Sequence, residues 1–265
     1  MGPSPAGAEA PFQTSVPSAI LLDYDTGTIL FEKEADRPFA PGTLAKVMTA
    51  DVVFANLRSG KITLQTEFFV SPDAWRRGGG PSGGAAMFAE VNKPVSVKDL
   101  LSGALVVSGN DAAITLAEGI AGSEPVFATL MNAEAKRIGM THTVFRNATG
   151  FSDPAQVSTA RDLGLLGQAV IRDFPDYYPI FAEPGITWNK IHQRNRNPLL
   201  DTTLGVDGLQ VGWIKDGGYH ALASAKLKNQ RLVAVTLGAK SEKERLEETK
   251  RSEEHTSELQ SPYVI

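Results

Sequence analysis

The sequence predicts a globular α+β fold, and three observations support this class. The chain has 265 residues, of which 42% are hydrophobic and 21% charged, the proportions of an ordinary soluble protein that can bury a sizeable core. Apolar runs of strand length lie near both ends of the chain, whereas helical periods occupy the middle. Strands from the two ends can then close one mostly antiparallel sheet around the helical region.

The first strands follow a short N-terminal segment. Residues 1–15 are rich in Ala, Pro and Gly, and their small residues resemble the cleavage end of an export signal. A flexible N-terminus is the alternative interpretation. The runs Ser18–Tyr24 and Thr28–Glu32 are joined by Asp25–Gly27, a turn signal that predicts a β-hairpin.

Helical periods fill the middle of the chain. Ser123, and the pair Ser158 and Thr159, precede two of these periods and are expected to be N-caps, because their hydroxyls accept hydrogen bonds from free backbone N–H groups. The expected helices are Leu44–Leu57, Val97–Val107, Ala112–Ile120, Pro125–Ile138 and Ala160–Ile171.

The C-terminal third contains a second group of strands. The apolar runs are separated by short polar turns, and they predict an antiparallel meander of three strands. The expected strands are Gly208–Ile214, Tyr219–Leu227 and Arg231–Leu237.

The last residues are set aside from the fold. A helical period starts at Glu242 and is expected to remain incomplete at Lys250. Residues 251–265 have no apolar period and resemble the in-frame translation of a sequencing adapter, so we interpret them as a scar. Any second domain or membrane anchor is expected to belong to a natural continuation after Lys250.

Composition excludes several functional classes. The chain has no Cys, which excludes a thiol nucleophile, a zinc ribbon and a redox pair. Its 26 Lys and Arg against 30 Asp and Glu give a formal net charge of −4, so nucleic acid is not an expected partner. The four His show no metal-ligand spacing, and neither a metal nor another cofactor is expected.

The first candidate motif lies at the start of a helix. Thr43 and Lys46 follow Pro41 and Gly42, and their spacing of three places a hydroxyl and an amine on one helix face. The positive end of the helix dipole favours a developing oxyanion there. The amine can act as base for the hydroxyl where burial or a nearby cation lowers its pKa. Taken alone, the pattern more often describes a capping Thr beside a solvated Lys.

Two more motifs complete the candidate site. Ser108–Asn110 lies between two helical periods, where a turn can present a hydroxyl and a carboxamide to a cleft. Gly208–Gly212 lies on an expected strand, where Gly lets a substrate backbone approach closely. A capping turn and an edge strand with a bulge are the structural alternatives.

The order of these motifs carries a resemblance to a known family. The sequence resembles the low-molecular-weight penicillin-binding proteins, which are serine-type D-alanyl-D-alanine carboxypeptidases. The resemblance implies their three-layer α/β/α fold, related to serine β-lactamases, with residues 16–250 as the catalytic domain. It is carried by the segments Pro17–Asp23, Ala40–Thr49, Ser108–Ala112, Asn147–Gly150, Trp188–Lys190 and Asp207–Leu209.

The resemblance also implies a reaction and its residues. It implies removal of the terminal D-alanine from peptidoglycan pentapeptide stems through an acyl-enzyme, in the periplasm or cell envelope, and covalent capture of β-lactams. Thr43 would be the nucleophile, Lys46 its base and Ser108 a proton relay. The backbone amides of Thr43 and Trp213 would form the oxyanion hole.

The substrate-binding residues carry over in the same way. Asn110 would hold the substrate amide, and Gln210, Val211 and Gly212 would line the end of the site that receives the terminal carboxylate. Lys46, the Ser108–Asn110 motif and Gly212 agree with the family pattern.

Three positions depart from the family pattern. Thr43 stands where the family has Ser, and its methyl group crowds a site shaped for Ser. Gln210 and Val211 stand where the family has Lys and Thr, so a cation and a hydroxyl donor are lost. A charge-assisted hydrogen bond contributes about 1.5–3 kcal/mol against about 1 for a neutral one, so we expect carboxylate binding to weaken about tenfold or more. Our hypothesis is therefore a retained fold with greatly reduced peptidase activity.

Other readings of the departures remain open. The chain is alternatively a catalytically impaired relative that binds peptidoglycan or a cell-wall enzyme. A β-lactamase needs an additional general base on an Ω-loop, and no Glu stands in a matching context. Read errors are a further explanation, which would require errors to cluster in active-site codons.

Overall fold

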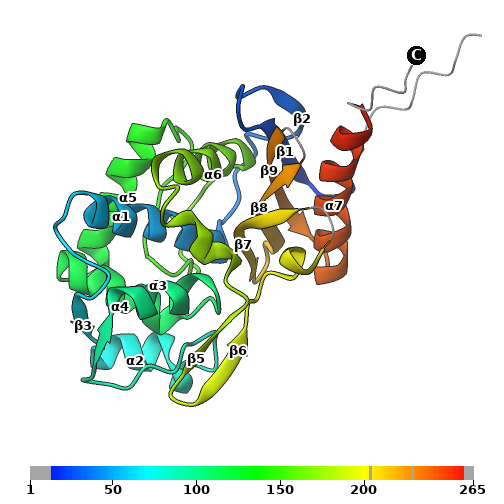
Figure 1. The fold of residues 1–265 in the computed structure, drawn as a ribbon. Coiled ribbons are helices and arrows are strands. Elements are labelled where there is room, and N and C mark those ends of the chain that lie inside the picture. Colours follow the sequence, from blue (N-terminus) through cyan, green and yellow to red (C-terminus); the bar gives the residue numbers. More distant parts are fainter. Residues whose placement is uncertain (1–12, 203–204, 228–229, 260–265) are drawn as a thin grey trace, which may run out of the picture.

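A five-stranded antiparallel sheet forms the centre of the molecule, in the order β2-β1-β9-β8-β7 (Figure 1). The structure is a computed structural model that describes residues 13–202, 205–227 and 230–259. N-terminal β1 pairs with β9, so strands from the two ends of the chain close one sheet, as predicted. The strands are β1 (Ser18–Asp23), β2 (Ile29–Lys33), β7 (Val206–Ile214), β8 (Gly218–Leu227) and β9 (Gln230–Ala239).

Helices cover both faces of this sheet. α6 (Ala160–Asp173) packs on one face against β1, β8 and β9, and α7 (Glu242–Leu259) packs on the other against β8 and β9 (Figure 1). This arrangement confirms the three-layer α/β/α class. No helix in the described parts of the chain is long and apolar enough to cross a membrane.

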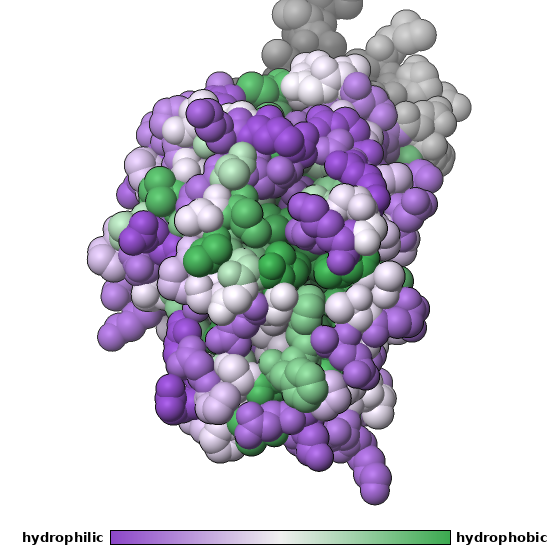
Figure 2. All heavy atoms as spheres, turned by 90° about the vertical axis from the view of Figure 1, so that its left-hand side faces the viewer, coloured by the Kyte–Doolittle hydropathy of each residue, from purple (hydrophilic) through white to green (hydrophobic). Residues whose placement is uncertain are grey.

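A helical region extends from one end of the sheet. In Figure 2, the side of the molecule that carries α1 and α5 is hydrophilic around its margin, with apolar side chains gathered across its middle. The helices of this region are α1 (Ala45–Arg58), α2 (Pro72–Gly78), α3 (Val97–Leu105), α4 (Asn110–Ala121) and α5 (Glu124–Ile138).

The sequence pattern explains these elements. Every residue of β1 is buried, as expected for a continuous apolar run between two strands, whereas β2 is an edge strand with an exposed face. The expected strands and helices are present to within two residues at either end. Thr159 caps α6 by accepting from the Asp162 amide at 3.1 Å. Ser123 occupies the N-cap position of α5, but its side chain makes no capping hydrogen bond.

Several elements were not expected from the sequence. The sequence did not predict α2 and two small two-stranded sheets, because their short segments lack a clear period. α7 continues past the expected end at Lys250 to Leu259, with Ser252 buried against the preceding turn. The expected export segment falls largely in residues 1–12, outside the described residues. The two small sheets are β3 (Glu67–Phe69) with β4 (Pro94–Ser96), which are far apart in the chain, and the hairpin of β5 (Gly185–Trp188) with β6 (Ile191–Arg194).

One carboxyl group is buried in the packing of α1. Asp51 is fully buried. Burial, and then the neighbouring carboxyl of Glu134 on α5, raise the pKa of Asp51. A carboxyl group with a raised folded-state pKa binds more protons when folded than when unfolded. Its contribution to stability is therefore present at low pH and declines as the pH rises from about 4, its ordinary pKa, toward the raised value.

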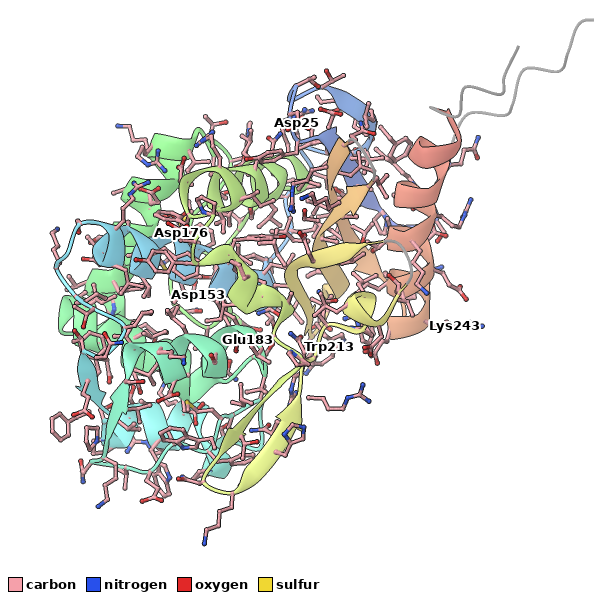
Figure 3. All side chains as sticks on the ribbon, viewed as in Figure 1. Asp25, Asp153, Asp176, Glu183, Trp213 and Lys243 are labelled. Carbon is pink, nitrogen blue, oxygen red and sulfur yellow. The ribbon has the colours of Figure 1, made fainter. Side chains whose placement is uncertain are left out.

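We predict that Asp51→Asn stabilises the protein more at about pH 8 than at about pH 5. The amide removes the carboxyl group that must ionise in a buried position, and each kcal/mol regained raises Tm by roughly 2–4 °C in a chain of this size. Thermal unfolding at the two pH values measures the effect. Asp25→Asn is the control, because Asp25 is exposed in the β1–β2 turn (Figure 3). Equal changes in Tm at both pH values would contradict the prediction.

Candidate active site

A cavity of about 480 Å³ opens where the start of α1, the start of α4 and β7 meet. Most of the residues expected in the site line it, from segments far apart in the sequence. Figure 3 labels Trp213 near the end of β7, where the chain passes the base of the β5–β6 hairpin. The expected residues that line the cavity are Thr43, Lys46, Ser108, Asn110, Val211, Gly212 and Trp213.

Backbone contacts fix the position of Thr43. Thr43 lies in a 3₁₀ turn, Gly42–Leu44, that leads directly into α1. A Cβ atom added to Gly212 would lie 2.7 Å from the Thr43 Cβ, so β7 passes directly against this residue. A Cβ atom added to Gly150 would overlap the Gly42 carbonyl oxygen. The turn therefore sits between two backbone segments that approach it only because they carry glycine.

Lys46 is held inside the protein. Its side chain is 1% exposed, and its Nζ donates to Asn110 Oδ1 and to the Thr149 carbonyl, each at 2.7 Å. Burial lowers the pKa of Lys46 to about 7. A neutral amine has two N–H donors and one lone pair. Both donors have acceptors here, so the neutral form leaves its lone pair free to accept a proton.

Three charged groups adjust this pKa. Asp111 raises the pKa of Lys46, Arg196 lowers it and Glu124 raises it, all by less than burial does. Asp111 is itself buried and accepts hydrogen bonds from three backbone N–H groups, those of Met87, Ala89 and Ala112. These acidic neighbours offset part of the desolvation of the amine.

Gln210 is placed differently from the expectation. It is 1% exposed and does not line the cavity. Its Nε2 donates to the Leu105 carbonyl at 3.3 Å, and its Oε1 accepts from Ser108 Oγ at 3.4 Å. The amide donor that could replace the family's lysine is therefore turned toward α3, whereas Val211 does line the cavity.

Sequence reasoning missed several residues around the cavity. Arg196, Lys215 and Arg245 line it and bring positive charge to its wall. Arg245 also donates to the Gly212 carbonyl at 3.4 Å. No sequence signal distinguishes these cations from exposed ones, because only the fold brings them to one wall.

In the described ranges, no group of three or more His, Asp or Glu side chains could hold a metal ion. His220 is fully buried, and burial lowers its pKa to about 4. Its ring therefore stays neutral near pH 7 and accepts at Nδ1 from the Gly238 amide at 3.0 Å.

Comparison with known proteins identifies the family. A family model described as D-alanyl-D-alanine carboxypeptidase, Peptidase_S11, matches residues 5–241. The chain belongs to this family. It is 44% identical over 235 residues to the D-alanyl-D-alanine carboxypeptidase DacC of Escherichia coli, an alignment that covers 88% of this chain and 58% of DacC. The chain spans less than two thirds of the curated carboxypeptidases that it matches first.

Solved structures of relatives share the fold. Penicillin-binding protein 5 from Haemophilus influenzae has a TM-score of 0.89 at 39% identity, over 92% of this chain and 71% of that one. Penicillin-binding protein D2 from Listeria monocytogenes, in its ampicillin-bound form, has a TM-score of 0.82 at 27% identity, over 93% and 98%. These similarities confirm the fold class that the carboxypeptidase resemblance implied.

We predict that Gly150→Ala destabilises the protein far more than Gly122→Ala. Both glycines have positive φ, 86° and 77°, so alanine is strained at either position. Only at Gly150 does the added Cβ meet backbone, whereas nothing lies within 4 Å at Gly122. Urea unfolding should show an additional loss of at least about 2 kcal/mol for Gly150→Ala. Equal losses in the two variants would show that the contact with Gly42 does not matter.

Proposed function

We propose that the chain is a D-Ala-D-Ala carboxypeptidase of the cell envelope that trims peptidoglycan pentapeptide stems through an acyl-enzyme. The observation that carries this proposal is the environment of Lys46, a buried amine with a pKa near 7 that lines the same cavity as Thr43 and Ser108. Family membership supports the substrate class and export to the periplasm. Residues 16–250 would be the catalytic domain, and residues 251–265 an adapter-derived scar.

Acylation would begin at Thr43. Its hydroxyl oxygen attacks the carbonyl carbon of the penultimate D-alanine, and the hydroxyl proton passes to the lone pair of Lys46. The resulting oxyanion accepts from the backbone amides of Thr43 and Trp213. Gly212 is essential for this arrangement, because its missing side chain lets β7 lie against Thr43.

Release of the terminal D-alanine requires the proton on Lys46 to reach the leaving nitrogen. The scissile C–N bond breaks as the nitrogen of the leaving D-alanine takes a proton that Ser108 relays from Lys46. Water then attacks the acyl-enzyme, which restores the Thr43 hydroxyl and frees the shortened stem. Asn110 would hold the substrate amide through its Nδ2, because its Oδ1 already accepts from Lys46.

Binding of the terminal carboxylate would be weak. Val211 offers no donor, and the Gln210 amide is engaged with Leu105. Arg196, Lys215 and Arg245 line the cavity and are the cations that could bind the terminal carboxylate in place of the family's lysine. Together with the methyl group of Thr43, these changes predict a slow enzyme, since a displacement of about 1 Å at a reacting group costs roughly a hundredfold in rate.

A second candidate is a relative that binds peptidoglycan or a cell-wall enzyme without catalysis. The position of Gln210 favours it, because the side chain that replaces the family's lysine is buried outside the cavity. Covalent modification of Thr43 distinguishes the two functions. The ampicillin-bound form of the Listeria relative supports a β-lactam as the probe.

We predict that penicillin acylates the natural chain on Thr43, about a hundredfold or more slowly than the triple variant Thr43→Ser, Gln210→Lys, Val211→Thr. Intact-mass spectrometry after incubation, followed by peptide mapping, measures the adduct and its position. Lys46→Met is the negative control, because it removes the base. Labelling of the triple variant alone would favour the binding relative over the carboxypeptidase.

We also predict that acylation accelerates as the pH rises through about 7. The neutral amine of Lys46 is the base, and its pKa is about 7, so the rate rises about tenfold per pH unit below this value and levels off above it. Stopped-flow or quench measurements of the penicillin adduct between about pH 5.5 and 8.5 give the profile. A rate that is flat or falls across this range would exclude Lys46 as the base.

A further inference from the structure

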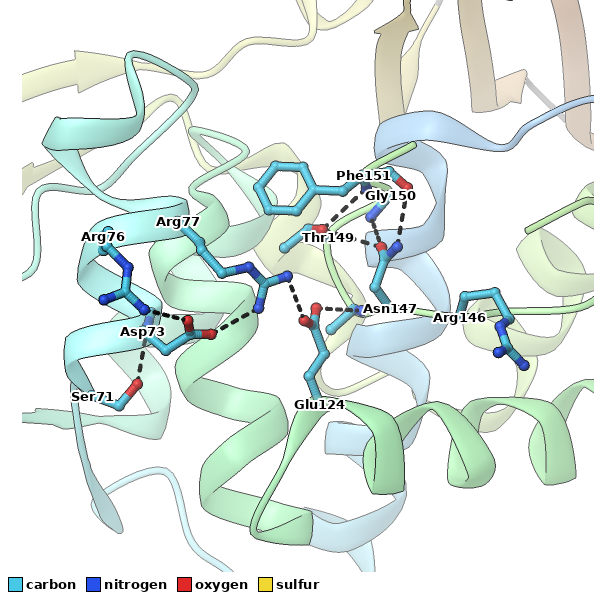
Figure 4. Close-up of polar contacts among 12 residues, drawn as sticks. Ser71, Asp73, Arg76, Arg77, Glu124, Arg146, Asn147, Thr149, Gly150 and Phe151 are labelled. Atoms are coloured by element: carbon cyan, nitrogen blue, oxygen red, sulfur yellow. Dashed lines mark hydrogen bonds and ion pairs between the residues drawn. The ribbon is translucent and has the colours of Figure 1, made fainter. Parts of the chain in front are cut away.

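Glu124 stands at the point where three elements meet. It is the first residue of α5 and is 7% exposed. Its Oε1 accepts from the Ala148 amide at 3.0 Å, and its Oε2 accepts from Arg77 of α2 at 3.0 Å (Figure 4). Arg77 also binds Asp73 at 2.8 Å. A buried carboxylate thus joins α2 and α5 to the segment that follows Asn147.

That segment supplies an acceptor to the amine of Lys46. Ala148 is fixed on both sides, because its amide donates to Glu124 and its carbonyl accepts from Thr49 Oγ1 at 2.8 Å. The next carbonyl, that of Thr149, accepts from Lys46 Nζ. Asn147 closes the turn by accepting from the Gly150 amide at 2.8 Å. Only one peptide unit separates the group that Glu124 binds from the group that binds Lys46.

We propose that Glu124 is a positioning residue for Lys46, which it serves by holding the Thr149 carbonyl in place and by setting a buried negative charge near the amine. This inference rests on the proposed function, in which Lys46 is the base. Arg77 tunes the effect, because its positive charge partly neutralises Glu124. The ion pair between α2 and α5 therefore controls how readily Lys46 gives up its proton.

The charged surroundings of both groups are defined. Asp111 of α4 and Glu124 of α5 raise the pKa of Lys46, and Arg196 lowers it. Glu118 and Asp73 are the further carboxylates near Glu124 and Arg77. The other charged groups that line the cavity are Lys215, Glu242 and Arg245. Of the two carboxylates that raise the pKa of Lys46, Asp111 accepts hydrogen bonds from backbone amides, whereas Glu124 also pairs with the cationic side chain of Arg77.

The test follows the titration of Lys46 directly. Glu124→Gln keeps an oxygen for the Ala148 amide and removes the charge. In protein labelled with ¹³C-lysine, NMR resolves Lys46 as the lysine that titrates near neutral pH. We expect its midpoint to fall by about 0.5–1 pH unit in Glu124→Gln, and to rise in Arg77→Gln, where the Glu124 charge is left uncompensated.

Asp162→Asn is the matched control. Asp162 is also a buried carboxylate in the first turn of a helix, and it accepts from the His142 amide at 2.8 Å. It anchors the same connection between α5 and α6 but is not among the charges that act on Lys46. We expect this variant to lose stability without moving the Lys46 midpoint.

The outcomes separate this inference from the proposed function. A Lys46 midpoint that is unchanged in Glu124→Gln, or that moves equally in Asp162→Asn, overturns the inference. If Glu124→Gln does not fold, Arg77→Gln decides, and a midpoint that fails to rise overturns it. Failure of the natural chain to react with penicillin would contradict the proposed function but leave the titration readable. Where acylation occurs, its pH profile should shift with the NMR midpoint in each variant.

Discussion

The start of α1 is wedged between two stretches of backbone, and the geometry of the cleft depends on this contact. Gly150 on one side and Gly212 on the other approach Gly42 and Thr43 so closely that a single methyl group would separate them. Thr43 is thereby fixed against β7, and Lys46 one turn later is fixed against the carbonyl of Thr149. These contacts join the sheet to the helical region beside the cavity.

The position of α1 between these two backbone segments also determines which polar groups surround Lys46. Only 1% of the Lys46 side chain is exposed, so its amine needs acceptors within the protein. Asn110, the first residue of α4, provides one acceptor through its Oδ1. The carbonyl of Thr149, in the turn that Asn147 closes, provides the other. The carboxylates of Asp111 and Glu124 then bind backbone amides of neighbouring segments. The same groups that brace the loops also set the charge around the amine.

The sequence predicted the secondary-structure elements and the short motifs, but it did not predict contacts between side chains that are distant in the chain. The strands and long helices were recognisable because their apolar periods are continuous. Thr43, Lys46, Ser108 and Asn110 were expected in one site because their motifs follow the order of a known family, and the structure places them around one cavity. Arg77 and Glu124 are 47 positions apart, and no periodicity links them. The Gln210 side chain points toward the Leu105 carbonyl because the end of α3 packs beside β7. The sequence motif on the strand gives no information about this packing.

The amine of Lys46 also has a consequence for the fold as a whole. An unfolded lysine has a pKa of about 10.4, whereas the folded protein holds Lys46 near 7. Folding near neutral pH therefore has to remove a proton that the unfolded chain retains, at a cost of about 4–5 kcal/mol relative to strongly alkaline solution. Domains are typically stable by only about 5–15 kcal/mol. The low pKa of Lys46 therefore lowers the stability of the fold at neutral pH. Packing in the buried sheet, and the glycine contacts that hold the start of α1 in place, must offset this cost.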